Sequence, residues 1–199
     1  MSPATAYRST GSAWVQSGLT GKVRHDGADV AFSPPTATAE AVAWPAGPSL
    51  TDGIDGDQDY NLGLEFSLFG VGGSCTGFRW APTPLTSTAP NGGVNIGRLW
   101  DAAGNALTAP VTFGPASGGG TVDVSFASPV SLSAATTYVV SVYTRRYVFL
   151  SNSTWDETSP SGRIRADRGR LRLDSDGVSR FPGDSFDAIY FISPLVVFA

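Results

Sequence analysis

The chain has 199 residues with a net charge of −4, and 41% of the residues are hydrophobic while 15% are charged. This length and apolar content suffice for one core of ordinary size and exclude two large domains. The acidic balance excludes a general basic surface for nucleic acid. No apolar window reaches the roughly 18 residues of a membrane helix, and no apolar segment typical of a secretory signal is seen. We therefore expect synthesis in the cytoplasm, no export by the usual route and no membrane partner.

An internal repeat occupies residues 7–32. Residues 7–14 (YRSTGSAW) align with residues 23–30 (VRHDGADV), with arginine and glycine at the same place in each copy. Each copy predicts a β-hairpin with a tight turn at Thr-Gly or Asp-Gly. Because an isolated hairpin is only marginally stable in water, we expect residues 1–32 to dock on another surface. The docking candidates are the larger side chains of the two copies, namely Tyr7, Arg8, Trp14, Arg24 and Val30.

These short hairpins resemble those near the N-terminus of minor tail proteins from phages of actinobacteria. The shared pattern is an aromatic residue or valine, then arginine, two residues, glycine, two residues, and tryptophan or valine. The resemblance implies assembly with other virion proteins through residues 1–50. The alternative interpretation is an ordinary hairpin appended to a domain.

Residues 33–51 are rich in proline, alanine and threonine and predict an extended connector, with Trp44 as its anchor. From residue 52 to residue 199 short segments alternate apolar with small or polar residues between turn residues, and none keeps a helical period. The sequence therefore predicts an all-β fold: an antiparallel two-sheet sandwich, jelly-roll-like, preceded by short hairpins. The expected strands lie at residues 62–69, 75–80, 93–100, 106–113, 121–126, 138–143, 147–150, 171–173 and 189–198.

The order of motifs in this region carries a second resemblance. The motifs LGLEF, TGFRW, GRLWDAAG, VSFASPV, TTYVVS and a closing IYFISPLVVF strand keep their order and spacing. They resemble a bacterial extracellular β-sandwich domain of uncharacterised function, over nearly all of residues 52–199. The resemblance implies the fold and an extracellular setting, but no reaction, because the family has no agreed catalytic residues.

Four carboxylates lie within eight residues at the start of this domain: Asp52, Asp55, Asp57 and Asp59. Calcium prefers hard oxygen ligands of this kind, and alternate loop positions can converge on one ion. The loop lacks the downstream bidentate glutamate of an EF-hand, since Glu65 falls within an expected strand. A solvated turn is therefore the favoured interpretation, and calcium is the one cofactor the sequence suggests.

A glycan-binding surface is expected around Trp155, which lies in the loop of residues 152–157. An exposed aromatic face suits the C–H groups of a sugar ring, whereas Trp80 and Trp100 lie in expected strands and are assigned to the core. The candidate partners precede this loop and are Tyr143, Arg145, Arg146 and Tyr147.

Five arginines crowd a short segment, namely Arg163, Arg165, Arg168, Arg170 and Arg172. They suit an anion-binding face for acidic glycans or cell-wall phosphates. Three interleaved aspartates (Asp167, Asp174 and Asp176) instead favour the charged solvent side of a strand pair, and we expect the latter.

No catalytic set can be assembled from the sequence. The one histidine, His25, lies in the N-terminal hairpin, and the lone Cys75 is expected to be a small buried residue. Neither a Ser-His pair, a spaced carboxylate pair, a zinc set nor a phosphate loop is apparent in the sandwich.

These features together predict a non-enzymatic bacteriophage virion protein. We expect a minor tail protein, forming a homo-oligomer, whose sandwich faces outward and adheres to host cell-surface glycan. A location in the tail is favoured over the capsid. The alternatives are a capsid decoration protein or a standalone carbohydrate-binding module.

Overall fold

A computed structural model of the chain describes residues 21–25, 28–32, 37–44, 54–55, 58–80, 95–114, 121–145, 147–151, 155, 157–174 and 177–198. The chain divides into two compact units, one formed by Met1–Ala37 with Ala199 and the other by Thr38–Phe198. In the described part of the chain, no helix is long and apolar enough to cross a membrane.

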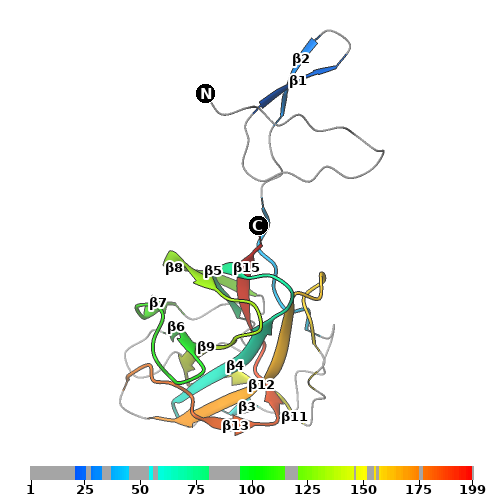
Figure 1. The fold of residues 1–199 in the computed structure, drawn as a ribbon. Coiled ribbons are helices and arrows are strands. Elements are labelled where there is room, and N and C mark those ends of the chain that lie inside the picture. The colour runs from blue at the N-terminus through cyan, green and yellow to red at the C-terminus, as the bar shows by residue number, and fades with distance from the viewer. Residues whose placement is uncertain are drawn as a thin grey trace. The chain divides into compact units, whose positions relative to one another are not determined.

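The first unit contains an antiparallel hairpin of β1 (Gly21–His25) and β2 (Ala28–Phe32), labelled in Figure 1. His25 pairs with Ala28, so that only Asp26 and Gly27 separate the two strands. The hairpin predicted at this Asp-Gly is therefore confirmed. The first copy of the repeat, residues 7–14, lies outside the described residues.

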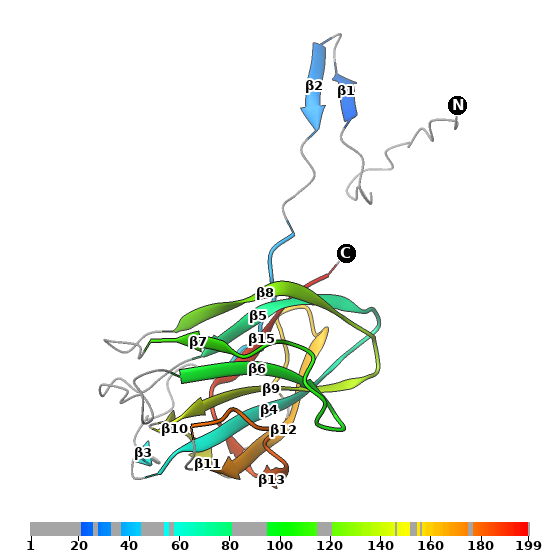
Figure 2. The ribbon, with the colours of Figure 1, turned by 90° about the vertical axis from the view of Figure 1, so that its left-hand side faces the viewer.

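The second unit is a sandwich of two antiparallel sheets, which Figure 2 shows as two layers. The larger sheet has the order β13-β12-β4-β9-β6-β7 and the smaller sheet the order β15-β5-β8. The predicted all-β sandwich is confirmed. The strands of the larger sheet are β4 (Tyr60–Leu68), β6 (Asn95–Asp101), β7 (Val111–Phe113), β9 (Thr137–Thr144), β12 (Ile164–Leu173) and β13 (Asp184–Phe186). Those of the smaller sheet are β5 (Gly73–Trp80), β8 (Val122–Leu132) and β15 (Ile192–Val197).

Two short ladders accompany these sheets. Strand β3 (Ile54–Asp55) pairs with β10 (Tyr147–Val148), and β11 (Leu150–Ser151) pairs with β14 (Ala188–Ile189). Residues 147–148 and 150–151 of the connection from β9 to β12 are thus held in extended pairing.

The core lies between the two sheets and follows from the alternation along each strand. On β4 the apolar residues Leu62, Leu64, Phe66 and Leu68 are buried and belong to the central apolar cluster. The intervening residues of β4 are therefore turned to the other face of the larger sheet, away from β5, β8 and β15. We call this other face the outer face.

A β-bulge in β12 decides which of its side chains reach the outer face. Arg165 pairs with Ser67 and Arg168 pairs with Glu65, and the register shifts between Ala166 and Arg168. Strict alternation would turn Arg165 and Arg168 to opposite faces, but a bulge adds one residue, here Asp167, and restores both arginines to the same face. Ile164 and Ala166 before the bulge and Gly169 after it are buried.

The second half of the connector belongs to the sandwich unit. Glu40 forms a bridge with Val196 of β15, and the backbone N–H of Val42 donates to Ser193 Oγ at 2.6 Å. The ring of Trp44 meets Phe191 edge-on, with 6.1 Å between ring centroids. Trp44 is therefore an anchor, as predicted. The sandwich unit starts at Thr38, earlier in the chain than the predicted residue 52.

Candidate glycan-binding site

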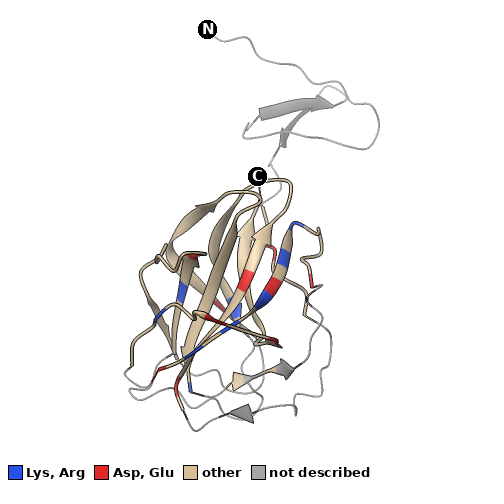
Figure 3. Ribbon diagram, turned by 60° about the horizontal axis from the view of Figure 1, so that its bottom comes forward, with Lys and Arg blue, Asp and Glu red and all other residues tan. Residues whose placement is uncertain are grey.

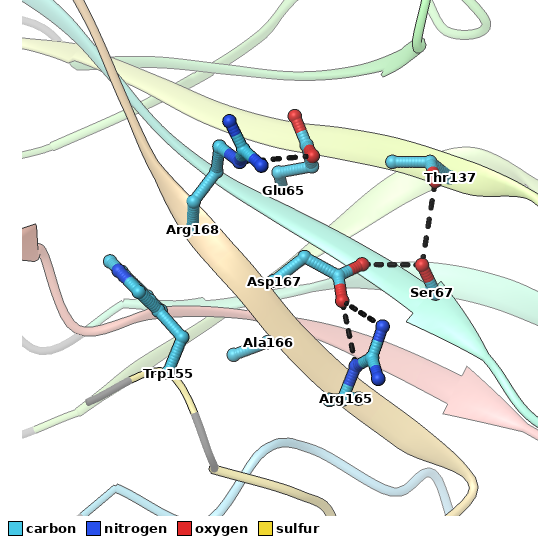
Figure 4. Close-up of a pocket in the computed structure, with 8 residues that line it drawn as sticks. All are labelled: Glu65, Ser67, Thr137, Trp155, Arg165, Ala166, Asp167 and Arg168. Atoms are coloured by element: carbon cyan, nitrogen blue, oxygen red, sulfur yellow. Dashed lines mark hydrogen bonds and ion pairs between the residues drawn. The ribbon is translucent and has the colours of Figure 1, made fainter. Parts of the chain in front are cut away.

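A pocket of about 350 Å³ opens on the outer face where β4, β9 and β12 lie side by side. Figure 4 shows its polar side chains along the strands and Trp155 beside β12, next to Ala166. The lining residues are Glu65, Ser67, Thr137, Trp155, Arg165, Ala166, Asp167 and Arg168. One tryptophan and a set of charged and hydroxyl side chains therefore share one hollow.

Strand register brings the polar residues of the pocket together. Ser67 pairs with Thr137 of β9 on one side and with Arg165 of β12 on the other. Its hydroxyl donates to an Asp167 oxygen and lies 3.4 Å from Thr137 Oγ1. These side chains thus form one row of hydrogen bonds across three strands (Figure 4).

Each carboxylate of the pocket is held by arginine. Arg165 places Nε and Nη2 each 2.7 Å from Asp167 Oδ1. Glu65 receives Arg170 Nε on Oε2 at 2.7 Å, and Arg168 Nε lies 3.5 Å from its Oε1. The side chains of Asp167 and Glu65 are 13% and 12% exposed, against 47% and 50% for Arg165 and Arg168. The carboxylates therefore lie deep, and the guanidinium groups form the outer layer.

The side of the pocket beside β12 is built by an aromatic cluster at the edge of the sandwich. Trp155 is half-buried and packs, together with Trp44, against Ile189 and Phe191. Phe191 takes a φ of 53°, which bulky residues rarely adopt, so the surrounding packing must hold it there. The indole N–H of Trp155 is buried and has no hydrogen-bond partner among the described residues. Trp155 is thus fixed by its neighbours.

The predicted tyrosines, Tyr143 and Tyr147, do not line the pocket. Tyr143 is 1% exposed; its hydroxyl donates to Asp59 Oδ2 at 3.0 Å and accepts from the Gly177 N–H at 3.0 Å. Tyr147 is 6% exposed and meets Tyr60 edge-on. Both rings are therefore buried rather than presented to solvent. Arg146 has no described side chain.

The reason for the burial of Tyr143 is a crossing segment. Residues 177–183 cover the part of the outer face that Tyr143 occupies. Besides Gly177 on the Tyr143 hydroxyl, Phe181 meets Trp100 edge-on at 5.9 Å, and a Cβ on Gly63 would lie 2.8 Å from Pro182 Cγ. Trp100 is buried as predicted, but under this segment and not between the sheets.

Asp59 is held by Arg145 and by Tyr143. Arg145 Nε lies 2.7 Å from Asp59 Oδ1, and Asp59 is 2% exposed. Both carboxylate oxygens therefore already have partners. Asp55 lies in β3, while Asp52 and Asp57 lie outside the described residues. Within the described ranges no group of three or more histidine, cysteine or acidic residues has a metal-binding arrangement. The calcium site stays a prediction.

The docking candidates fall in the first unit. Arg24 pairs with Asp29, and Val30 pairs with Val23, in the β1–β2 hairpin. Tyr7, Arg8 and Trp14 lie outside the described residues. Docking therefore stays a prediction.

Cys75 is fully buried in the core, as expected. Burial raises the pKa of its thiol to about 12. The thiol is therefore neutral and shielded at neutral pH, which is unlike a catalytic cysteine.

Comparison with known proteins gives one match. Residues 47–192 match a family described as a domain of unknown function, DUF4082, and this span includes every residue that lines the pocket. No curated protein and no solved structure matches the chain. Because the match covers well over half of its length, the chain belongs to the DUF4082 family.

Proposed function

We propose that this chain is a non-enzymatic bacteriophage virion protein, a minor tail protein whose sandwich faces outward and adheres to host cell-surface glycan. The pocket beside Trp155 is the observation that carries the adhesion. It combines an aromatic side chain for the apolar face of a sugar ring with a row of hydrogen-bonding groups for its hydroxyls. The strands β4, β9 and β12 hold these groups on a rigid support.

The arrangement of the two carboxylates supports binding over hydrolysis. Two-carboxylate hydrolysis of a glycoside needs an acid and a base that flank the scissile bond and are free to exchange protons. Asp167 and Glu65 instead accept hydrogen bonds from Arg165, Arg170 and Ser67. Asp167 and Glu65 thus serve to position the arginines.

The unit of residues 1–37 supports the placement in a virion. It contains a confirmed hairpin whose backbone pairing is complete from Gly21–Phe32 to His25–Ala28. So short a hairpin needs another surface to be stable, which a neighbouring virion chain or a second copy supplies. A capsid decoration protein would use the same unit for the same purpose, whereas a standalone carbohydrate-binding module would not need it.

Replacement of Trp155 tests the adhesion. The full-length chain is expected to bind cell envelopes prepared from actinobacterial hosts, and Trp155→Ala should weaken this binding about tenfold or more, as for an aromatic anchor. Phe186→Ala is the control, because it removes an exposed aromatic side chain that does not line the pocket. Sedimentation with the envelopes gives the affinity, and circular dichroism verifies the fold of each variant. If the wild-type chain binds no envelope, or binds as well without Trp155, the proposal is wrong.

A further inference from the structure

The carboxylate oxygens of the pocket already accept hydrogen bonds from protein side chains. Asp167 uses one carboxylate oxygen for Arg165 and the other for Ser67. Glu65 accepts from Arg170 on one oxygen, and its other oxygen lies 3.5 Å from Arg168 Nε. A ligand that donates hydrogen bonds would therefore have to share these oxygens with arginine or serine.

The same pocket keeps donors free. A guanidinium carries several N–H groups in a planar fork. Arg165 turns Nε and Nη2 to Asp167, and its guanidinium lies 4.8 Å from the ring centroid of Phe69. Among the described residues, Arg168 has long polar contacts, 3.5 Å to Glu65 and 3.4 Å to Ser185 Oγ. Both side chains are about half exposed, which leaves N–H groups within reach of a ligand. An incoming acceptor can take them without breaking the short bonds below.

Arginines outnumber carboxylates in the ion pairs of this face, although the chain as a whole is acidic. Among the described residues, β12 and the residues just after it join five arginines to three carboxylates on the outer face. Figure 3 shows basic residues in blue and acidic residues in red close together on neighbouring strands. The arginines are Arg165, Arg168, Arg170, Arg172 and Arg180, and the carboxylates are Glu65, Asp167 and Asp174. A local excess of this sign attracts anions.

We infer that the pocket selects acidic saccharides: a sugar ring lies against Trp155, and its carboxylate or phosphate group takes the free N–H groups of Arg165 and Arg168. Guanidinium groups match the geometry of both anions, and these charge-assisted hydrogen bonds are stronger than neutral ones. The inference rests on the proposed glycan adhesion and names the class of glycan.

Titration of the full-length chain with defined saccharides tests this selectivity. The probes are hyaluronan and alginate oligosaccharides for the carboxylate, glycerol-phosphate teichoic acid for the phosphate, and cellotetraose and chitotetraose as neutral sugars. At least one acidic probe is expected to bind about tenfold more tightly than both neutral probes. The carboxylate and phosphate arms then tell the two anions apart. Because exposed charges are screened by salt, the preference should shrink as salt is added.

A substitution at Arg168 tests whether this residue causes the preference for acidic saccharides. Arg168→Gln is expected to reduce binding of the acidic probe about tenfold and to leave neutral probes unchanged. Arg172→Gln is the matched control, since Arg172 is equally exposed on the same strand but does not line the pocket. Equal affinity for neutral and acidic probes, or an Arg168→Gln variant that binds like the wild type, would overturn the inference. In that case envelope binding that still depends on Trp155 leaves the proposed adhesion intact, whereas no envelope binding removes both.

Discussion

Arg145→Met is expected to lower the free energy of unfolding by about 3 kcal/mol, the low end of the range for breaking a buried ion pair from one side. Asp59 is 2% exposed, and the variant leaves its carboxylate with the hydrogen bond from the Tyr143 hydroxyl but without the guanidinium. The cost is placed at the low end because the Arg145 side chain is itself 30% exposed. Urea unfolding followed by tryptophan fluorescence measures the change.

The control for Arg145 is a second ion pair of similar distance at the surface. Arg79 donates to both oxygens of Asp123 at 2.7 and 2.8 Å, but the two side chains are 42% and 48% exposed. Arg79→Met should therefore cost only about 0.5 kcal/mol. Equal effects of the two substitutions would show that burial of Asp59 does not set the cost. An Arg145→Met chain of normal stability that loses glycan binding would instead return Arg145 to the role of a ligand contact.

Gly97→Ala is expected to lower the free energy of unfolding by about 2 kcal/mol, as overpacking of a filled core does. A Cβ on Gly97 would lie 2.1 Å and 2.3 Å from ring atoms of Phe78. That ring is fully buried and packs on Phe113 and Phe126, with centroids 5.6 and 5.9 Å away, so it has little room to withdraw. The urea midpoint at unchanged slope gives the difference.

Two further variants test whether the contact between the added Cβ and Phe78 causes this loss of stability. Gly114→Ala is the control, because nothing lies within 4 Å of a Cβ at that position, and it should leave stability within about 0.5 kcal/mol. Phe78→Leu makes room, so the double variant with Gly97→Ala should cost less than the sum of the single variants. A Gly97→Ala chain as stable as the wild type would mean that the core yields at this point.

The fold was predictable because its signal is local. Apolar segments such as residues 62–69 and 138–143, with turn residues between them, are enough to indicate strands. The Asp-Gly pair likewise predicted the β1–β2 hairpin, since both positions suit the backbone of a tight turn.

Strand β12 shows where local alternation misleads. The expected strands included only residues 171–173 here, although the arginines of residues 163–172 were expected on the solvent side of a strand pair, and β12 runs over Ile164–Leu173. The arginines of this segment have odd residue numbers before Asp167 and even numbers after it. This shift breaks the two-residue period, although the strand continues through a bulge. Arginines recur at every second residue on each side of Asp167, with small or apolar residues between them. The shift by one position between Arg165 and Arg168 is the signal that points to the bulge and to the pocket beside it.

The candidate site was predictable only in part, because the burial of a residue on the outer face depends on segments that are distant in sequence. Trp155 was predicted and lines the pocket, whereas Glu65, Ser67 and Thr137 come from strands far away in sequence and were not predicted as ligand contacts. Tyr143 points to the outer face, as a candidate contact should, but residues 177–183 cover it. Neither the crossing segment nor the register that aligns Ser67 with Thr137 is encoded in a local pattern.

A reconstruction of the intact phage particle tests the central proposal most directly. The expected result is density for this chain in the tail, with residues 1–37 against a neighbouring virion chain and the pocket beside Trp155 open to the outside. Absence of the chain from purified particles, or a pocket closed by a neighbouring chain, would contradict it.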